Sequence, residues 1–217
     1  ENSTEGIVNK TLDRLAKTDL NICGEIVLPV HHYVLSRCDD LSQISQIYSH
    51  PQALAQCADW LAKSLPNAAV MPVRSTSRAC VLASKEATTA AIASKIALDY
   101  HDLNILEKNI EDDPNNATRF YILGRQIPEP TRQDKTTMLV WIPHKPGALA
   151  RLLGYFSENK INLTMIESRP YAHQMWEYIF FLEMDGHQEE PKIKRTIAQL
   201  LNDKITVNVL GSYPKAM

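Results

Sequence analysis

The sequence predicts an α/β protein with two modules, and three observations lead to this prediction. Over residues 1–124, apolar runs of strand length alternate with segments of helical periodicity, which favours a largely parallel sheet flanked by helices. A polar stretch from Arg125 to Lys135, stiffened by Pro128 and Pro130, then interrupts the alternation and is typical of a linker. Beyond it the elements restart in the order βαββαβ, which is that of a ferredoxin-like module.

The elements of the first module follow from periodicity and flanking residues. Val8, Leu12 and Leu15 recur at helical spacing, which predicts the first helix. Proline is favourable in a first helical turn, so a second helix is expected to begin at Pro51. The predicted helices span residues 6–17, 51–61, 76–84 and 94–100, and the predicted strands span residues 22–30, 32–35, 47–49, 68–73, 90–93 and 120–123.

The second module is predicted in the same way. Strands are expected over residues 136–142, 163–167, 176–184 and 205–209, and helices over residues 147–158 and 191–201. The predicted domain organisation is therefore a first domain over 1–127, a linker over 128–135 and a second domain over 136–217.

Composition excludes several classes of function. The chain has 217 residues, 44% hydrophobic and 22% charged, with a net charge of −2 and both signs interspersed. We therefore expect a soluble globular protein that does not bind nucleic acid or an anionic membrane surface, and no apolar run is long enough to cross a membrane. Cys23, Cys38, Cys57 and Cys80 lack metal-binding spacing, which predicts reduced thiols and a cytoplasmic protein.

Three segments of the first domain suit small anions. Ser49–Pro51 and Thr76–Ser77 each lie where a predicted strand meets a helix, and free N–H groups at a helix start can hold a carboxylate. Plain helix capping is the simpler explanation of either segment taken alone. Thr118–Phe120 enters an apolar strand, so Thr118 and Arg119 can reach one cleft edge only where the backbone turns; the alternative is a strand-entry threonine beside a solvated arginine.

Several motifs are missing from the sequence. It contains no P-loop, no GxGxxG, no metal-ligand cluster and no Gly-x-Ser-x-Gly elbow, so we expect any catalysis to proceed without a cofactor or metal. Residues Glu1 to Gly6 lack an initiating methionine and the features of a signal peptide, so we expect a fragment of a longer protein.

An ordered set of short motifs spans nearly the whole chain. In the first domain they are Glu1-Asn2-Ser3 with Gly6, Tyr48-Ser49-His50-Pro51-Gln52, Gln56-Cys57, Ser75-Thr76-Ser77, Asn109-Ile110 and Asn116 to Phe120. In the second domain they are Pro146-Gly147-Ala148-Leu149, Glu167-Ser168-Arg169-Pro170, Trp176-Glu177-Tyr178 and Gly211-Ser212-Tyr213-Pro214. Together they resemble prephenate dehydratase with its phenylalanine-sensing ACT domain, either alone or within a bifunctional chorismate mutase/prephenate dehydratase.

The resemblance implies a dehydratase domain with two lobes, like a periplasmic binding protein, of which most of the first lobe would precede Asn2. It assigns Thr118 to hydrogen-bonding or protonating the departing ring hydroxyl, although a relay or simple positioning is equally possible. Arg119 suits a bidentate carboxylate clamp. The remaining polar lining of the catalytic site would be Asn2, Ser49, Gln56 and Thr76.

In the ACT module, the resemblance implies a phenylalanine site shared between two chains. Its expected members are Gly147, Ala148 and Leu149 at a helix start, Asn162 for the amino group of the ligand, and Glu167, Ser168, Arg169 and Pro170 across a dimer interface.

Two positions depart from the family pattern. Arg74 stands where bifunctional relatives often have an acid, and His101 stands where a glycine is common.

The function implied is the decarboxylating dehydration of prephenate to phenylpyruvate, with feedback by L-phenylalanine and assembly into a homodimer or higher oligomer. The alternative is a catalytically inactive fragment that binds phenylalanine and dimerises.

Overall fold

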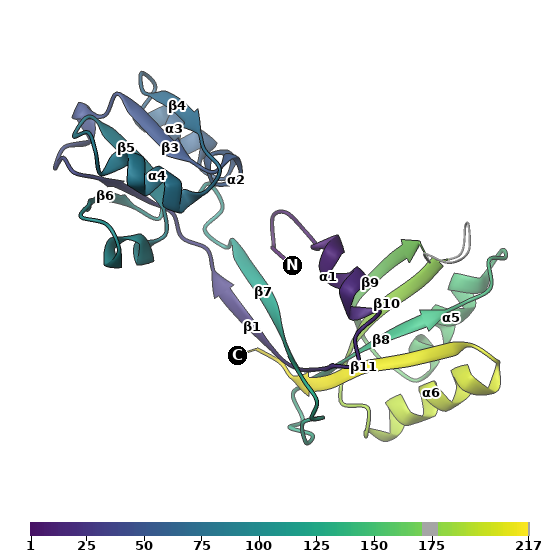
Figure 1. Ribbon diagram of the computed structural model, residues 1–217. Helices are drawn as coiled ribbons and strands as arrows, with labels where there is room; N and C mark the ends of the chain where they lie inside the picture. Colours follow the sequence, from purple (N-terminus) through teal and green to yellow (C-terminus); the bar gives the residue numbers. More distant parts are fainter. Residues whose placement is uncertain (171–177, 217) are drawn as a thin grey trace. The chain divides into compact units, whose positions relative to one another are not determined.

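The structure is a computed structural model that describes residues 1–170 and 178–216. It confirms an α/β fold, with helices packed on sheets (Figure 1). The chain forms two compact units. Unit 1 comprises Glu1, Ile7–Val27 and Arg119–Met217, and unit 2 comprises Asn2–Gly6 and Leu28–Thr118.

Unit 2 is built on a five-stranded sheet in the order β4-β3-β5-β2-β6. Its strands are β2 (Tyr33–Ser36), β3 (Gln46–Ser49), β4 (Ala69–Pro72), β5 (Thr89–Ala93) and β6 (Asn104–Lys108). β3 is parallel to β4 and β5, whereas β2 is antiparallel to β5 and β6. The expectation of a largely parallel sheet is thus only partly met, because the strand–helix alternation that a parallel pair needs is present only from β3 to β5.

The predicted helix from Pro51 is two helices, α2 (Pro51–Ala55) and α3 (Ala58–Ser64). The cause lies far along the chain. The carboxylate of Asp112 accepts hydrogen bonds from the backbone N–H groups of Asp59 and Trp60, both at 3.1 Å. A carboxylate that satisfies the free N–H groups of a first turn starts a new helix there, so the apolar periodicity continues while the helix does not.

The remaining short elements of unit 2 agree with the sequence predictions only in part. α4 (Thr76–Ala83) begins where expected, because the Ser75 hydroxyl accepts a hydrogen bond from the Arg78 N–H at 3.1 Å. The segment predicted as a fourth helix is instead the 3₁₀ helix η2 (Lys95–Asp99). A second 3₁₀ helix, η1 (Leu41–Gln43), and strand β6 were not predicted.

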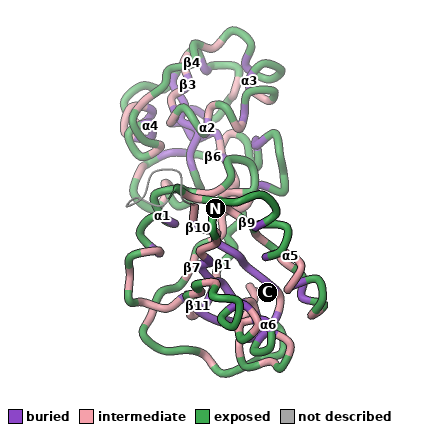
Figure 2. The backbone as a smooth tube through the Cα atoms, turned by 90° about the vertical axis from the view of Figure 1, so that its right-hand side faces the viewer, coloured by how far each residue is buried: buried purple, intermediate pink, exposed green. Residues whose placement is uncertain are grey.

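Different helices cover the two faces of this sheet. Ala90 and Ile92 of β5 belong to the buried cluster that includes Leu61 of α3, whereas Ala91 belongs to the cluster that includes Cys80 of α4. Successive side chains of a strand point to opposite faces, so β5 is buried on both. Figure 2 shows that buried positions gather in the strands.

The second module is confirmed as a four-stranded antiparallel sheet with two helices, in the ferredoxin-like order. Its elements are β8 (Asp134–Trp141), α5 (Ala148–Glu158), β9 (Leu163–Pro170), β10 (Tyr178–Asp185), α6 (Pro191–Asn202) and β11 (Thr206–Pro214). The strands lie in the order β11-β8-β10-β9. Phe156 of α5 and Leu200 of α6 pack with Met138 and Leu182 on one face of the sheet. Trp176 and Glu177, predicted to begin the third strand, lie outside the described residues.

The opposite face of this sheet is also covered. Leu12 of α1 (Asn9–Leu15) and Ile22 pack with Leu139 and Phe181 in a buried cluster. Segments that the sequence assigns to the first domain therefore contribute one layer of unit 1.

The chain passes between the units within two strands. β1 (Asn21–Pro29) and β7 (Ala117–Gly124) form a two-stranded sheet, and the border between the units falls after Val27 in one and after Thr118 in the other. The compact units thus group residues differently from the domains proposed from sequence, whose borders stay a prediction. No helix in the described ranges is long and apolar enough to span a membrane.

Candidate active site

A cavity of about 350 Å³ lies in unit 2 at the carboxyl ends of β3 and β4. His50 follows β3 directly and Arg74 follows β4 closely, so two loops meet at the edge of the sheet where ligands usually bind in α/β folds. The lining residues are Asn2, Val30, His32, His50, Gln52, Ala53, Gln56, Arg74, Ser75, Thr76 and Thr118. Among the predicted catalytic residues, Asn2, Gln56, Thr76 and Thr118 are brought together here.

Asn2 and Thr118 are tied together at the cavity wall. The Nδ2 of Asn2 donates hydrogen bonds to Thr118 Oγ1 at 3.0 Å and to Asn116 Oδ1 at 2.9 Å. The orientation of this amide is fixed by its other end, because Oδ1 accepts hydrogen bonds from the backbone N–H groups of Thr4 and Glu5, both at 3.0 Å. A backbone N–H can only donate, so the atom facing Thr118 must be the nitrogen.

This bond determines what the Thr118 hydroxyl can do. A hydroxyl has one proton and two acceptor lone pairs. Because Oγ1 of Thr118 accepts from Asn2, its proton is not used in that bond and can be donated to a ligand in the cavity. The Thr118 hydroxyl is therefore available as a hydrogen-bond donor.

Gln56 ends α2 and is held by two neighbours. Its Oε1 lies 2.9 Å from His32 Nε2, and its Nε2 lies 3.5 Å from Thr4 Oγ1. Among residues 1–170 and 178–216, Nδ1 of His32 is the buried side-chain polar atom without a hydrogen-bond partner. Leaving such an atom unpaired costs about 1–3 kcal/mol. The sequence analysis missed His32, which lies between the end of β1 at Pro29 and the start of β2 at Tyr33.

Arg74, Ser75 and Thr76 form the cationic side of the cavity. The lining residues all lie within residues 1–170, and among them Arg74 is the one permanent cation and none is an Asp or Glu. The wall therefore suits an anionic ligand. The sequence analysis had singled out Arg74 only as a departure from the family pattern.

Ser49 is not among the residues that line this cavity, and its part in the catalytic site stays a prediction. Its hydroxyl donates to the carbonyl oxygen of Ile92 at 2.6 Å, and the residue is fully buried. This bond joins β3 to β5 beneath His50. A hydroxyl at a strand end was read as a ligand contact, but the neighbouring strand supplies its partner.

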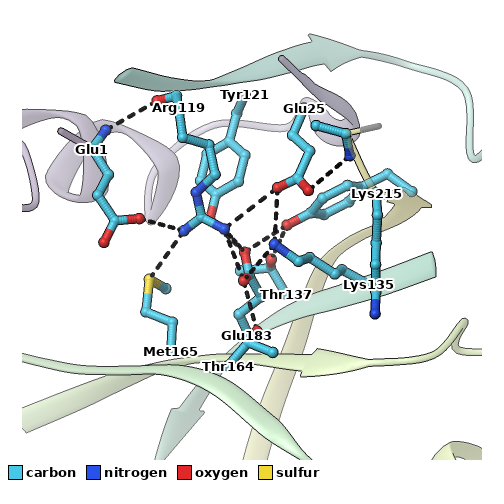
Figure 3. Close-up of polar contacts among 12 residues, drawn as sticks. Glu1, Glu25, Arg119, Tyr121, Lys135, Thr137, Thr164, Met165, Glu183 and Lys215 are labelled. Atoms are coloured by element: carbon cyan, nitrogen blue, oxygen red, sulfur yellow. Dashed lines mark hydrogen bonds and ion pairs between the residues drawn. The ribbon is translucent and has the colours of Figure 1, made fainter. Parts of the chain in front are cut away.

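Arg119 lies next to Thr118 in the chain but does not line the cavity. Its Nη1 is 2.9 Å from each carboxylate oxygen of Glu183 and 3.4 Å from Glu25 Oε2, while its Nη2 is 2.6 Å from Glu1 Oε2 (Figure 3). All these residues belong to unit 1. The side chain of Arg119 is 16% exposed and that of Glu183 is 1% exposed, so the ion pair is shielded from water.

Neighbouring donors surround the Glu183 carboxylate. Thr164 Oγ1 donates to Oε1 at 2.7 Å, and Lys135 Nζ lies 3.2 Å from the same oxygen. The hydroxyls of Tyr121 and Tyr213 donate to Oε2 at 3.0 and 2.9 Å. Both oxygens are thus fully engaged, which is what a buried carboxylate requires.

These contacts keep Glu183 ionised. Burial alone raises its pKa, but the Thr164 hydroxyl, Arg119 and Lys135 outweigh burial and lower the pKa of Glu183 to about 2. Burial, followed by the charge of Glu183, raises the pKa of Tyr121, so this phenol stays a neutral donor. The cluster is therefore a fixed charge pair within a network of neutral hydrogen-bond donors.

The expectation that Thr118 and Arg119 both reach one cleft edge stays a prediction, since the two side chains lie apart in this structure. β7 is already extended at Ala117, so the two side chains project in opposite directions. Thr118 lines the cavity in unit 2, and Arg119 binds carboxylates in unit 1. The geometry gives no support to Arg119 as a substrate clamp.

A second cavity of about 120 Å³ lies in unit 1 at the start of α5. Gly147 precedes the helix with φ 77°, a left-handed conformation that favours glycine. Ala148 and Leu149 line this cavity, as does Lys145. The full lining is Ile142, Pro143, His144, Lys145, Ala148, Leu149, Tyr178 and Phe180.

The other residues predicted to bind phenylalanine are not part of that lining. Asn162 donates to Asp185 Oδ2 at 2.8 Å. Glu167, Ser168, Arg169 and Pro170 lie in β9, and the guanidinium of Arg169 binds both oxygens of Asp13 at 2.9 and 3.0 Å. Whether a second chain would bring them to the ligand stays a prediction.

The pairing, burial and clustering of the four cysteines and of the possible metal ligands bear on further sites in the described residues. Cys23, Cys38, Cys57 and Cys80 are all free. Burial raises the pKa of Cys57 to about 12 and that of Cys80 to about 11, which disfavours the reactive thiolate. In the described ranges, no group of three or more His, Cys, Asp or Glu side chains could hold a metal ion.

Comparison with known families agrees with the motifs. The family model described as "Prephenate dehydratase" matches residues 1–128, and the one described as "ACT domain" matches residues 136–202.

Similarity to known proteins extends over the whole of this chain. A bifunctional chorismate mutase/prephenate dehydratase of Aquifex aeolicus is 42% identical over 217 residues, which is 100% of this chain and 60% of the relative. A prephenate dehydratase of Methanocaldococcus jannaschii is 38% identical over 220 residues, which is 99% of this chain and 79% of the relative. The chain spans about 60% of the length of the bifunctional relatives it matches.

Among solved structures, the prephenate dehydratase of Arthrobacter aurescens in complex with L-Phe aligns with a TM-score of 0.85 at 35% identity. The alignment covers 98% of this chain and 72% of that one.

Proposed function

The chain belongs to the prephenate dehydratase family and carries an ACT domain, and from this premise we propose that its protein converts prephenate into phenylpyruvate for L-phenylalanine synthesis. In this reaction the bond between the ring and its carboxylate breaks, carbon dioxide leaves, and the bonding pair enters the ring. The ring hydroxyl departs with its own bonding pair and takes up a proton to become water. Aromatisation drives the step, so the enzyme has to hold two carboxylates and assist the leaving oxygen.

The observation that carries the proposal is the bond from Asn2 to Thr118. It leaves the Thr118 proton free to be donated to a ligand, so Thr118 would hydrogen-bond the departing hydroxyl as charge develops on it. Arg74 is the cation placed to bind a substrate carboxylate, with Thr76 and Gln56 as neutral polar contacts. An aliphatic alcohol is a weak acid, which favours hydrogen bonding over full proton transfer from Thr118.

The test is prephenate turnover by the full-length protein, measured as phenylpyruvate formation. Thr118→Ala should lower kcat by about 100-fold or more with little change in KM, since the interaction develops mainly in the transition state. Thr118→Ser keeps the hydroxyl and is the matched control, with most of the activity retained. Equal kcat for Thr118→Ala and the unmodified protein would remove Thr118 from the mechanism.

We further propose that L-phenylalanine regulates the protein through the ACT domain, in a cytoplasmic homodimer or higher homo-oligomer. The proposal is supported by the left-handed Gly147 at the start of α5 and by the adjacent cavity, which Lys145 makes cationic. The A. aurescens relative was solved with L-Phe bound. Calorimetry and sedimentation with and without L-phenylalanine test this, and binding at full affinity by a monomer would contradict a site shared between chains.

The alternative of an inactive phenylalanine-binding fragment has less support. The relatives are named as enzymes, and the polar cavity of unit 2 has no role in that alternative.

A further inference from the structure

We propose that His32 is a positioning residue for Gln56: its imidazole donates a hydrogen bond to the oxygen of the Gln56 amide and so keeps the amide nitrogen as a donor for the substrate. The proposal rests on the dehydratase function proposed above, because it concerns the same cavity. Both residues line that cavity, and both belong to unit 2.

The orientation of the Gln56 amide follows from its contact with Thr4. The Thr4 hydroxyl lies 2.7 Å from Asn2 Oδ1, which can only accept, so the single hydroxyl proton of Thr4 is donated there. Nε2 of Gln56 lies 3.5 Å from the same hydroxyl. Because Thr4 has no second proton to give, the Gln56 atom that faces it has to be a donor, which is the nitrogen. The oxygen of the amide is then the atom that faces His32.

This orientation determines which nitrogen of His32 carries a proton. Nε2 of His32 lies 2.9 Å from Gln56 Oε1, and an amide oxygen only accepts, so Nε2 is the protonated nitrogen. In the neutral imidazole Nδ1 is then unprotonated. Its surroundings agree, because Nδ1 is buried and finds no hydrogen-bond partner among residues 1–170 and 178–216. A proton on Nδ1 would make it a buried donor without an acceptor.

The backbones of His32 and Gln56 are bonded to the same short segment. The Ile110 N–H donates to the His32 carbonyl at 3.1 Å, and the Asp112 N–H donates to the Gln56 carbonyl at 2.8 Å. Between them, Oε2 of Glu111 accepts from the His32 N–H at 2.9 Å. Burial alone raises the pKa of Glu111, but this bond and one from a neighbouring imidazole outweigh burial and lower the pKa. The imidazole and the amide therefore extend from backbones that one segment fixes.

The direction of the bond decides what Gln56 offers to a ligand. An amide nitrogen has two protons; Thr4 accepts one, and the second remains for a substrate oxygen. If Nε2 of His32 were an acceptor, the amide would be reversed and its oxygen would replace this N–H. An amide oxygen repels a carboxylate, whereas Arg74 and the Thr118 hydroxyl offer donors in the same cavity. His32 thus makes Gln56 match the other polar groups of the wall.

His32→Asn tests the proposal in the full-length protein. The asparagine amide ends near the position of Nδ1, so the donor to Gln56 is lost. We expect KM for prephenate to rise about fivefold or more with kcat within about threefold, because a weakened contact affects substrate and transition state alike. His32→Gln places an amide nitrogen near the position of Nε2 and should recover most of the loss. Equal KM in His32→Asn and the unmodified protein would overturn the proposal.

Ser36→Ala is the matched control for stability. Ser36 is a fully buried residue of β2 whose hydroxyl donates to the Thr89 carbonyl at 2.7 Å, and it does not line the cavity. Thermal unfolding should show a loss of stability, while KM should hold. If Ser36→Ala raised KM as much as His32→Asn does, the effect would be general damage and the positioning role would be refuted.

A double-mutant cycle tests whether His32 acts through Gln56. Gln56→Met removes both the oxygen that His32 binds and the N–H offered to the substrate. In that background His32→Asn should raise KM no further. Multiplicative effects of the two changes would show that His32 acts independently of Gln56, against the proposal.

Nitrogen-15 NMR of the histidine side chains gives a readout that needs neither substrate nor a variant. In the unmodified protein, Nε2 of His32 should have the chemical shift of a protonated nitrogen and Nδ1 that of an unprotonated one. If the protein fails to turn over prephenate, the proposed function is wrong, yet the spectrum still decides whether His32 donates to Gln56. A proton on Nδ1 with none on Nε2 would overturn the positioning role.

Discussion

Gly211 of β11 passes Ile22 of β1 so closely that a β-carbon on Gly211 would lie 2.1 Å from the Ile22 carbonyl oxygen. The atoms in the way are backbone, so no side-chain rotation can relieve the contact. The approach brings β1 onto the edge strand of the sheet and explains why the Gly-Ser-Tyr-Pro motif begins with glycine.

Gly211→Ala should therefore destabilise the protein by about 3 kcal/mol or more, as expected for overpacking against a fixed backbone. Thermal or urea unfolding measures this. Gly154→Ala is the control, because nothing lies within 4 Å of a β-carbon there and the residue is inside α5. That change should stabilise by about 0.5–1 kcal/mol. Equal stability of the two variants would mean that β1 and β11 do not meet as described.

Glu183 should make the free energy of unfolding depend on pH in the acid range. Its pKa is lowered from 4.5 to about 2 in the folded protein, so its contribution is complete above pH 4.5 and is lost as the pH falls towards 2. This pKa shift corresponds to about 3 kcal/mol in the free energy of unfolding. Urea unfolding between pH 6 and pH 2.5 should show the gap between the unmodified protein and Glu183→Gln narrowing as the pH falls. A gap that does not vary with pH would contradict the ionised, paired state.

Arg74→Gln should raise KM for prephenate by about tenfold or more while changing kcat less, because a lost carboxylate contact weakens binding of substrate and transition state alike. Arg74→Lys should be intermediate, since an ammonium keeps the charge and loses the fork. Arg78→Gln, in the first turn of the helix that follows Arg74 but outside the cavity lining, serves as the control and should leave KM unchanged. Steady-state kinetics that show equal KM for all three variants would remove Arg74 from the site.

Gly147→Ala should weaken L-phenylalanine binding. At φ 77° a side chain strains the backbone by about 1–2 kcal/mol, and the turn that presents the first N–H groups of α5 would shift. Calorimetry measures the affinity, and Gly154→Ala in the same helix provides a comparison in which affinity should hold. Unaltered binding in Gly147→Ala would place the ligand elsewhere.

Sequence patterns predicted most of the elements, because the order of strands and helices is a local property. They failed where a distant residue intervenes. The break between α2 and α3 depends on Asp112, about fifty residues downstream of the helix it caps, and no local periodicity reports it. The antiparallel position of β2 likewise depends on which strand it meets, not on its own residues.

The residues predicted for the candidate site also fall into two groups, those whose position follows from local motifs and those whose partners only the fold reveals. Asn2, Gln56, Thr76 and Thr118 were found by motif and do share one cavity. Ser49 and Arg119 belong to the same motifs, but each has a partner that only the folded chain reveals, the Ile92 carbonyl for one and Glu183 for the other. His32 was missed because a histidine after a strand carries no local sign of an unpaired nitrogen.

The packing of α1 and Ile22 against the four-stranded sheet determines which truncated fragments of this protein keep a covered core. A fragment that starts at the linker would carry the whole ACT segment and still leave Leu139 and Phe181 facing water, because the layer that covers them is encoded more than a hundred residues earlier. Exchanging ACT segments between relatives should therefore require residues 7–27 to be transferred as well. In this protein the domain borders along the sequence therefore differ from the borders of the fragments that would keep their packing.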